Sequence, residues 1–210
     1  MISLIKQCID QPSTIILGAG GHACVVADAL ITSHCNVIGF TDNAVPVGQV
    51  VFDNIQVLGT DDIILEQKSE DIMLAMGLGF LPGNNLRYEL FEKVKAWGYK
   101  FRATIHASAV IGKQVTINEG TQIMAGVTIQ PNVKIGSNVI INTAANIDHD
   151  TIIGDHCHIA PGSTICGDVS IGDKCFIGAG ATIIQGVDIG DNVIIPAGET
   201  VRKNILSDWV

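Results

Sequence analysis

One segment of this sequence combines an imidazole with two carboxylates, in the run Asp148-His149-Asp150. A neutral imidazole can accept a proton near physiological pH, and a neighbouring carboxylate can hold the ring in one tautomer and stabilise the imidazolium that forms. The residue types and their spacing therefore predict a general base at His149. A His-Asp turn on an inert surface has the same composition, so the prediction requires that the fold direct the ring outward.

A glycine-rich turn is the second candidate for chemistry. An apolar run at residues 14–17 breaks at Gly18-Ala19-Gly20-Gly21-His22 and continues as a second apolar run at 23–30. Such a turn between a strand and a helix can bring a phosphate against backbone N–H groups at the helix N-terminus. Asp42 ends the next strand, where an acidic residue roughly 20 positions beyond the glycines can bond a ribose hydroxyl. A tight turn and a solvated aspartate would leave the same pattern.

The second half of the chain is organised by a repeat. Isoleucine occurs at every sixth position from Ile105 to Ile195, and Val201 closes the series. A period of six cannot keep one face of an α-helix apolar, whereas short strands joined by tight corners can. A small or β-branched residue stands four positions after most of these residues, as at Val127 and Ala145. The pattern predicts a parallel β-helix with coils of about 18 residues.

The repeat also assigns positions to the histidines. His149 falls at a corner of its six-residue repeat, or hexad. This position directs its side chain out of the three-sided prism that the coils form. His158 follows nine residues later, half a coil away, so one prism presents the two histidines on different faces. If both belong to one catalytic centre, a neighbouring subunit must supply the second, as in a cyclic trimer. His156 is predicted to be a surface residue, and Cys157 to be a structural residue in an inward position.

The first hundred residues follow a different pattern. Strand signals occur at residues 14–17, 36–40 and 71–76, and helix signals occur at 23–30 and 85–97. This order predicts a small parallel α/β domain of Rossmann-like type. The last helix is predicted to bury Leu86, Leu90, Phe91 and Val94 on one face. The boundary is predicted near Ala103, which gives domains of residues 1–103 and 104–210.

Composition narrows the class of partner. The 21 acidic against 12 basic residues disfavour a nucleic-acid or anionic-membrane surface. No segment is long enough to span a bilayer, and the N-terminus lacks the features of a signal peptide, so we expect a cytoplasmic protein without membrane insertion. The six cysteines form no CxxC pair and are expected to be reduced.

Three motifs point to a family: GAGGHA at residues 18–23, GNNLR at 83–87 and INTAANIDHDTIIGDHCHIAPG at 141–162. With the hexads, they make the chain resemble the bacterial nucleotide-sugar N-acetyltransferases of the PglD type and the related NeuD-type sialic-acid O-acetyltransferases. The resemblance implies a left-handed, trimeric β-helix that holds acetyl-CoA between subunits. It also implies an N-terminal domain that binds the UDP part of a UDP-4-amino-4,6-dideoxy sugar, for bacterial surface glycan biosynthesis, with no metal required.

The resemblance implies roles for individual residues. His149 would be the catalytic base, Asp150 would raise its basicity, and Asn142 would contact the substrate near the reacting centre. The residues placed on the nucleotide sugar are Gly20, Gly21, His22, Asp42, Asn43 and, as a weaker match, Gly59. The residues placed along the acetyl-CoA channel are His158, Gly167, Ala179 and Ala197. The expected reaction is direct acetyl transfer without an acyl-enzyme.

Two alternatives stay open. An O-acetyltransferase of a sialic-acid-like sugar would use the same base and donor site with another acceptor. A zinc-dependent lyase of the γ-carbonic-anhydrase kind also uses a left-handed β-helix, and its ligands would come from His106, His149, His156 and His158. The chain departs from the family pattern in a longer loop, MGLGFLPGNN at 76–85, in Ala107 where the family has proline, and in the missing GxPA motif near the C-terminus.

Overall fold

The computed structural model describes residues 12–206. These residues divide into two compact units. The first runs to Gly79 and continues with Asn84–Ala107, and the second consists of Phe80–Gly83 and the chain from Ser108 onward.

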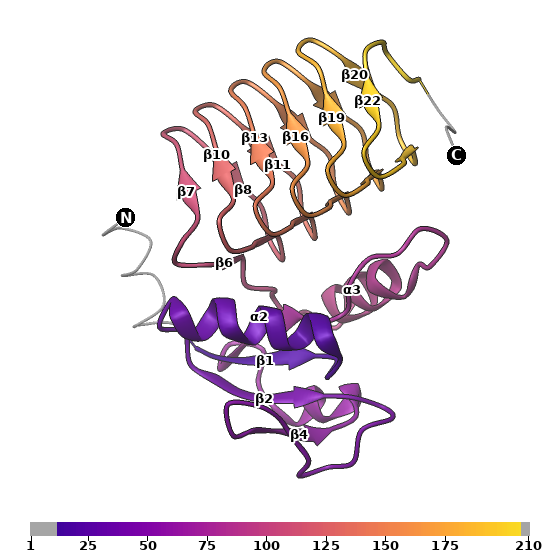
Figure 1. The fold of residues 1–210 in the computed structure, drawn as a ribbon. Helices are drawn as coiled ribbons and strands as arrows, with labels where there is room; N and C mark the ends of the chain where they lie inside the picture. The colour runs from indigo at the N-terminus through magenta and orange to yellow at the C-terminus, as the bar shows by residue number, and fades with distance from the viewer. Residues whose placement is uncertain (1–11, 207–210) are drawn as a thin grey trace. The chain divides into compact units, whose positions relative to one another are not determined.

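The first unit is built on a five-stranded sheet with the order β3-β4-β2-β1-β5 (Figure 1). Its strands are β1 (Ser13–Leu17), β2 (Val37–Thr41), β3 (Val50–Phe52), β4 (Ile55–Gly59) and β5 (Ile72–Met76). Its helices are α2 (Gly21–Thr32), the short 3-10 helix η1 (Asp61–Glu66) and α3 (Leu86–Ala96), and the chain leaves the unit through β6 (Thr104–Ile105). All pairs are parallel except β3 with β4. The predicted Rossmann-like α/β fold is confirmed.

The core of this unit lies between the sheet and α3. Apolar residues of β1 and β5 pack against Phe91 and Phe101, whose rings stack with centroids 4.6 Å apart. The predicted apolar face of the last helix is wrong at its first residue, because Leu86 is 60% exposed. Arg87 is buried there instead and donates a hydrogen bond from Nη1 to the carbonyl of Leu78.

Strands β3 and β4 lie outside the predicted pattern. They form a hairpin around Asp53 and Asn54, which have φ angles of 44° and 62°. A two-residue hairpin turn needs the left-handed region at both positions, and Asp and Asn tolerate that region better than most residues. The signal was therefore present, as an Asp-Asn pair between two short apolar runs.

The second unit is a parallel β-helix, visible as stacked coils in Figure 1. Each strand has two residues: β7 (Val110–Ile111), β8 (Thr116–Ile117), β9 (Gln122–Ile123), β10 (Thr128–Ile129), β11 (Lys134–Ile135), β12 (Ile140–Ile141), β13 (Asn146–Ile147), β14 (Ile152–Ile153), β15 (His158–Ile159), β16 (Thr164–Ile165), β17 (Ser170–Ile171), β18 (Phe176–Ile177), β19 (Thr182–Ile183), β20 (Asp188–Ile189), β21 (Ile194–Ile195) and β22 (Thr200–Val201). They form three sheets, which we name the β7 sheet (β22-β19-β16-β13-β10-β7), the β8 sheet (β20-β17-β14-β11-β8) and the β9 sheet (β21-β18-β15-β12-β9).

The hexad explains both the interior and the corners of this prism. From Ile123 to Ile195, each isoleucine of the repeat is at most 3% exposed. Coils stack in register at a spacing of 18 residues, so that Ile129 pairs with Ile147 and Ile147 with Ile165. A residue with positive φ recurs at every sixth position from Gln114 to Gly198, and most of these are Gly, Asn or Asp. The corner backbone therefore fixes where side chains such as Asp150 (φ 62°) can lie.

Two further expectations concern the whole chain. Within residues 12–206, no helix is both long and apolar enough to cross a membrane. Among the described residues, the free thiols are those of Cys24, Cys157, Cys166 and Cys175. Cys35 is disulfide-bonded, so the expectation of reduced cysteines is wrong for that residue.

Candidate active site

His149 lies at a corner of the β-helix between β13 and β14, and its side chain is 58% exposed. Its Nδ1 atom is 2.7 Å from Oδ2 of Asp150. The other oxygen, Oδ1, accepts a 3.0 Å hydrogen bond from Nδ2 of Asn132. Because a carboxylate oxygen only accepts, Nδ1 of His149 carries a hydrogen, and the neutral ring presents Nε2 as its proton acceptor.

The carboxylates around His149 favour its protonated form. The hydrogen bond with Asp150 raises the pKa of His149 above the ordinary value for histidine, and the charges of Asp148 and Asp168 act in the same direction. The hydrogen bonds from His149 and Asn132 lower the pKa of Asp150. Asp150 therefore stays ionised beside the ring, and the pair can accept a proton at Nε2.

The absence of a side chain at Gly167 leaves space for the His149 ring. It stands one coil beyond His149, and a Cβ atom built on it would lie 2.7 Å from Nε2 of His149 and 2.8 Å from Cε1. The backbone around the ring is held by the N–H of Asp168, which donates to the carbonyl of His149 over 2.9 Å. Only glycine at 167 leaves this ring position open. Gly167 thus contacts the predicted base within one chain, whereas the resemblance places it along the acetyl-CoA channel.

His158 lies in a different environment. It is the first residue of β15 and is 8% exposed. Nε2 of His158 is 3.1 Å from Nδ2 of Asn142, and Nδ1 is 3.2 Å from the carbonyl oxygen of Phe80. Since that carbonyl only accepts, Nδ1 carries the hydrogen and Nε2 accepts from the Asn142 amide. The rings of Phe80 and Phe176 meet the imidazole edge-on.

The predicted catalytic residues, the acetyl-CoA residues and the predicted substrate residue Asn142 therefore occupy two separate parts of one β-helix. His149, Asp150 and Gly167 lie at the corner between the β7 and β8 sheets. Asn142, Ala179 and Ala197 lie at the corner between the β9 and β7 sheets, near His158 at the start of β15. Ala179 and Ala197 are exposed and stand one coil apart, and the N–H of Gly198 donates to the carbonyl of Ala179.

In the first unit, Asp42 ties the glycine-rich turn to the loop after β2. Its Oδ2 accepts from the backbone N–H of Ala19 at 2.9 Å, and its Oδ1 accepts from Ala44 and Val45. Desolvation raises the pKa of Asp42, but these hydrogen bonds outweigh it and the pKa is lowered. An ionised Asp42 thus shapes the turn and still has lone pairs for a ligand.

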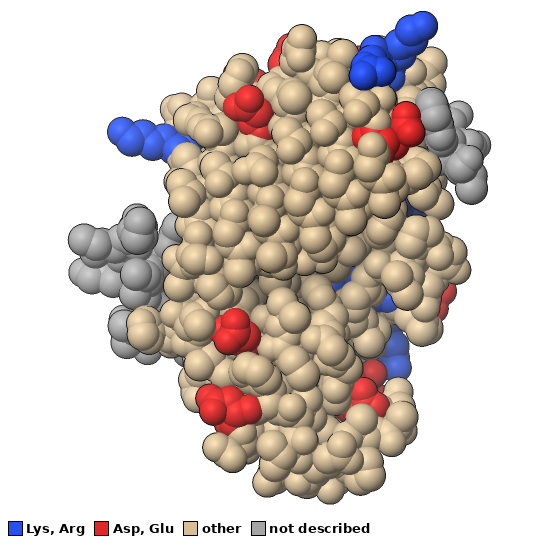
Figure 2. Space-filling view, viewed as in Figure 1, with Lys and Arg blue, Asp and Glu red and all other residues tan. Residues whose placement is uncertain are grey.

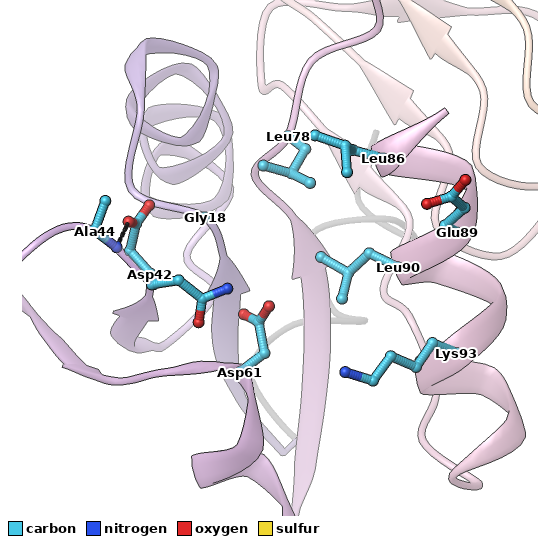
Figure 3. A pocket seen from close by; sticks show the side chains of 10 residues that line it. Gly18, Asp42, Ala44, Asp61, Leu78, Leu86, Glu89, Leu90 and Lys93 are labelled. Atoms are coloured by element: carbon cyan, nitrogen blue, oxygen red, sulfur yellow. Dashed lines mark hydrogen bonds between the residues drawn. The ribbon is translucent and has the colours of Figure 1, made fainter. Parts of the chain in front are cut away.

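A cavity of about 370 Å³ opens beside this turn. Its lining comes from the ends of β1, β2, β4 and β5 and from α3: Gly18, Asp42, Asn43, Ala44, Asp61, Leu78, Leu86, Glu89, Leu90 and Lys93. Figure 3 shows Asp61 and Lys93 directed into the space from opposite sides, with Leu78 and Leu90 adding apolar surface. The carboxyl ends of parallel strands are where open α/β sheets bind ligands.

The other residues predicted to bind the nucleotide sugar do not line this cavity. Gly20 caps the N-terminus of α2 and Gly21 begins the helix, and a Cβ on either would meet open space. His22 faces Gly79, with its Cβ 3.7 Å from a Cβ built there. Gly59 is buried against Ile63 and contributes its carbonyl, which accepts the N–H of Asp42. Gly59 therefore supports Asp42 and does not line the cavity.

The prediction missed several residues of both sites. Asn132 stands 18 residues before Asp150, so the coil length alone could have placed it beside the carboxylate. Asp61 and Lys93 had no such signal, because they come from elements that only the folded sheet brings together. Burial raises the pKa of Cys157 well above the ordinary range of a thiol, which supports a structural role for that residue.

The surface charges and the metal-binding side chains do not mark a further site. Figure 2 shows acidic and basic side chains scattered over one face, singly or in small groups. Among residues 12–206, no group of three or more His, Cys, Asp or Glu side chains is placed to hold a metal ion. Within one chain, the four histidines of the zinc alternative do not form a ligand set.

Known protein families match both units of the chain. The family described as PglD N-terminal domain matches residues 13–94. The bacterial transferase hexapeptide family matches residues 114–145 and 132–167, and the hexapeptide repeat of succinyl-transferase matches residues 168–203. A search among curated proteins gave no match.

Solved structures similar to this chain include acetyltransferases. Perosamine N-acetyltransferase from Caulobacter crescentus, solved with CoA and GDP-perosamine and with one histidine replaced by asparagine, is 34% identical over 92% of this chain and 90% of its own, with a TM-score of 0.82. The acetyltransferase domain of PglB from Neisseria gonorrhoeae is 29% identical over 93% of both chains, with a TM-score of 0.83. WeeI from Acinetobacter baumannii, at 21% identity and a TM-score of 0.63, shares the fold.

Proposed function

Because the chain belongs to the PglD/NeuD-type family of hexapeptide-repeat acyltransferases, we propose that it acetylates the amino group of a nucleotide-linked 4-amino sugar, with His149 as the general base. It is an acetyltransferase of nucleotide sugars that uses acetyl-CoA as co-substrate. The observation that carries the proposal is the exposed pair of His149 and Asp150, with Nδ1 and Oδ2 2.7 Å apart, at a corner of the β-helix.

The proposed reaction is a direct transfer. The sugar amine adds to the thioester carbonyl of acetyl-CoA while Nε2 of His149 takes the proton that the amine loses. A backbone N–H stabilises the oxyanion of the tetrahedral intermediate. Collapse of the intermediate breaks the C–S bond, and the proton on His149 passes to the departing thiolate. The products are the N-acetylated sugar nucleotide and free CoA, and no acyl-enzyme forms.

The nucleotide sugar is proposed to bind in the first unit. The cavity beside the glycine-rich turn supports this assignment, because its lining combines Gly18 of that turn, the Asp42 carboxylate and apolar surface from Leu78 and Leu90. The resemblance implies UDP as the nucleotide. The GDP-perosamine bound by the similar Caulobacter crescentus enzyme makes GDP the second candidate.

A substrate panel tests the proposal. The purified full chain would be incubated with acetyl-CoA and, in turn, UDP-4-amino-4,6-dideoxy sugars, GDP-perosamine and a free sialic-acid-type sugar, while thiol release and product mass are recorded. We expect N-acetylation of a nucleotide-linked amino sugar. Acetylation of only the free sialic-acid-type sugar would overturn the N-acetyltransferase assignment and establish the O-acetyltransferase alternative.

The base is tested separately. His149→Gln keeps the size of the side chain and removes its proton acceptor, so we expect turnover to fall by about 10²–10⁴-fold with little change in folding. Circular dichroism would report the fold. Wild-type turnover in a folded His149→Gln enzyme would show that another group is the base.

A further inference from the structure

Asn132 has no part in the proposed reaction, yet it contacts the carboxylate beside the base. Its Nδ2 donates to Oδ1 of Asp150 over 3.0 Å, while Oδ2 of the same carboxylate lies 2.7 Å from Nδ1 of His149. The three side chains form a continuous chain of hydrogen bonds that ends at the imidazole. We propose that Asn132 is a positioning residue, which fixes the Asp150 carboxylate in the orientation that holds the His149 ring.

The stacking of coils brings these side chains together. Asn132 and Asp150 occupy equivalent corners of successive coils, both with left-handed φ (66° and 62°). The N–H of Asp150 donates to the carbonyl of Pro131, so the two corners are also joined through the backbone. The backbone thus sets the distance between the two side chains before their hydrogen bond forms.

The carboxylate needs an external support because it is open to solvent. The Asp150 side chain is 49% exposed, so water competes for its oxygens and its last torsion is broad. A bond to each oxygen, from His149 on one side and Asn132 on the other, restricts that torsion. Oδ2 then stays aligned with Nδ1 of His149.

An amide suits this position better than a cation. The charged groups that face His149 are the carboxylates of Asp148, Asp150 and Asp168, and their charge stabilises the imidazolium. A lysine or arginine at position 132 would hold Asp150 and cancel part of that charge. The neutral amide of Asn132 orients the carboxylate and leaves its charge to act on His149.

Two substitutions at one position separate this role from a structural one. Asn132→Gly tolerates the left-handed corner and removes the donor. Asn132→Asp also tolerates the corner but places a second carboxylate against Asp150. Asn192, an exposed corner residue with φ 58°, provides matched controls in Asn192→Gly and Asn192→Asp.

The first readout is titration of the His149 ring by NMR in the full-length protein, with His149→Gln used to assign its signal. We expect the titration midpoint to move to lower pH in Asn132→Gly, as Asp150 loses its alignment, and to higher pH in Asn132→Asp, as negative charge is added, each by about half a pH unit. The Asn192 variants should titrate like the wild type. Identical titration of His149 in both Asn132 variants and the wild type would overturn the proposal.

The second readout is kinetic and rests on the proposed function. With the acceptor that the wild type acetylates, we expect kcat of Asn132→Gly to fall about five- to tenfold, with KM for acetyl-CoA unchanged and the acid limb of the pH profile moved to lower pH. An unchanged kcat and pH profile would contradict the positioning role. Full activity of His149→Gln would refute the proposed base alone, since the ring titration still decides whether Asn132 acts on Asp150.

Discussion

At the scale of single residues, the two atoms of interest on His149 have different environments. Nδ1 is bound to Asp150, and Nε2 lies close to Gly167, where a Cβ would approach it to 2.7 Å. The first contact fixes the tautomer and raises the pKa of the ring, and the second requires that position 167 carry no side chain. The residue types alone predict the first arrangement, whereas the second depends on the absence of a side chain one coil away.

The pH dependence of the reaction tests the role of Asp150. His149 must be neutral to accept a proton, so activity should rise with pH through the raised pKa of His149. Asp150→Asn removes the largest cause of that raised pKa, and we expect the acid limb of the kcat/KM profile to move to lower pH, with a plateau lower by about tenfold or more. An acid limb that stays in place would show that Asp150 does not control the basicity of His149.

Gly167→Ala tests the space beneath the ring. The added Cβ would come within 2.7 Å of Nε2, and all three atoms that it meets belong to the His149 side chain, which is 58% exposed and can be displaced if its bond to Asp150 breaks. We expect the thermal unfolding midpoint to change little while kcat falls by about 10²-fold, because the base is misplaced. A loss confined to KM for acetyl-CoA would favour the channel role that the resemblance implies for Gly167.

At the scale of elements, the residues that stabilise the β-helix differ from those available for chemistry, even within strands of two residues. The second residue of most strands is an isoleucine buried in the prism, and the first is exposed or half-buried except in β9, β12 and β15, where Gln122, Ile140 and His158 are buried. Corners carry the polar side chains, since their backbone conformation selects Gly, Asn and Asp. Functional residues can therefore occupy corners without disturbing the buried stack.

The two adjacent isoleucines of β14 allow this difference between buried and outward positions to be tested. Ile153 is 2% exposed and Ile152 is 47% exposed, although they are adjacent. We expect Ile153→Ala to lower the free energy of unfolding by about 2–5 kcal/mol and Ile152→Ala to change it by about 0.5 kcal/mol or less. Urea unfolding of both variants would check this difference, and equal effects would contradict the assigned faces.

At the scale of the whole molecule, the division of the predicted site between two corners favours a shared site. His149 and Gly167 lie at one corner, and Asn142, Ala179 and Ala197 lie at another. We propose that the β-helix assembles as a trimer in which His149 of one subunit meets the acetyl-CoA residues of its neighbour. A cyclic trimer repeats such a contact three times with identical geometry.

Mixed assemblies test this sharing. His149→Ala removes the base, and Ala197→Trp obstructs the proposed channel, so each variant alone should be inactive. When both chains are co-expressed in equal amounts, a shared site should recover about a quarter of wild-type activity, because random pairing leaves that fraction of interfaces intact. Light scattering should report the mass of three chains. An inactive mixture would place both groups in one subunit.

Much of this architecture was readable from local pattern. The six-residue period predicts the β-helix, its coil length and the outward direction of His149, because the isoleucine and the small residue four positions later must face the interior for the coils to stack. The alternation of apolar runs with a glycine turn predicts the first unit except for its β3–β4 hairpin. The family, and with it acetyl-CoA, follows from motifs and not from the period.

The sequence by itself therefore determined the fold class, the Asp148-His149-Asp150 run and the glycine-rich turn. Only the tertiary structure decided that Asn132 bonds Asp150, that Gly167 underlies the His149 ring, and that Asp61 and Lys93 face one cavity. The physical reason is that local pattern records which way a side chain points. Its partners depend on the register between coils and strands, which backbone hydrogen bonding and packing fix only when the chain folds.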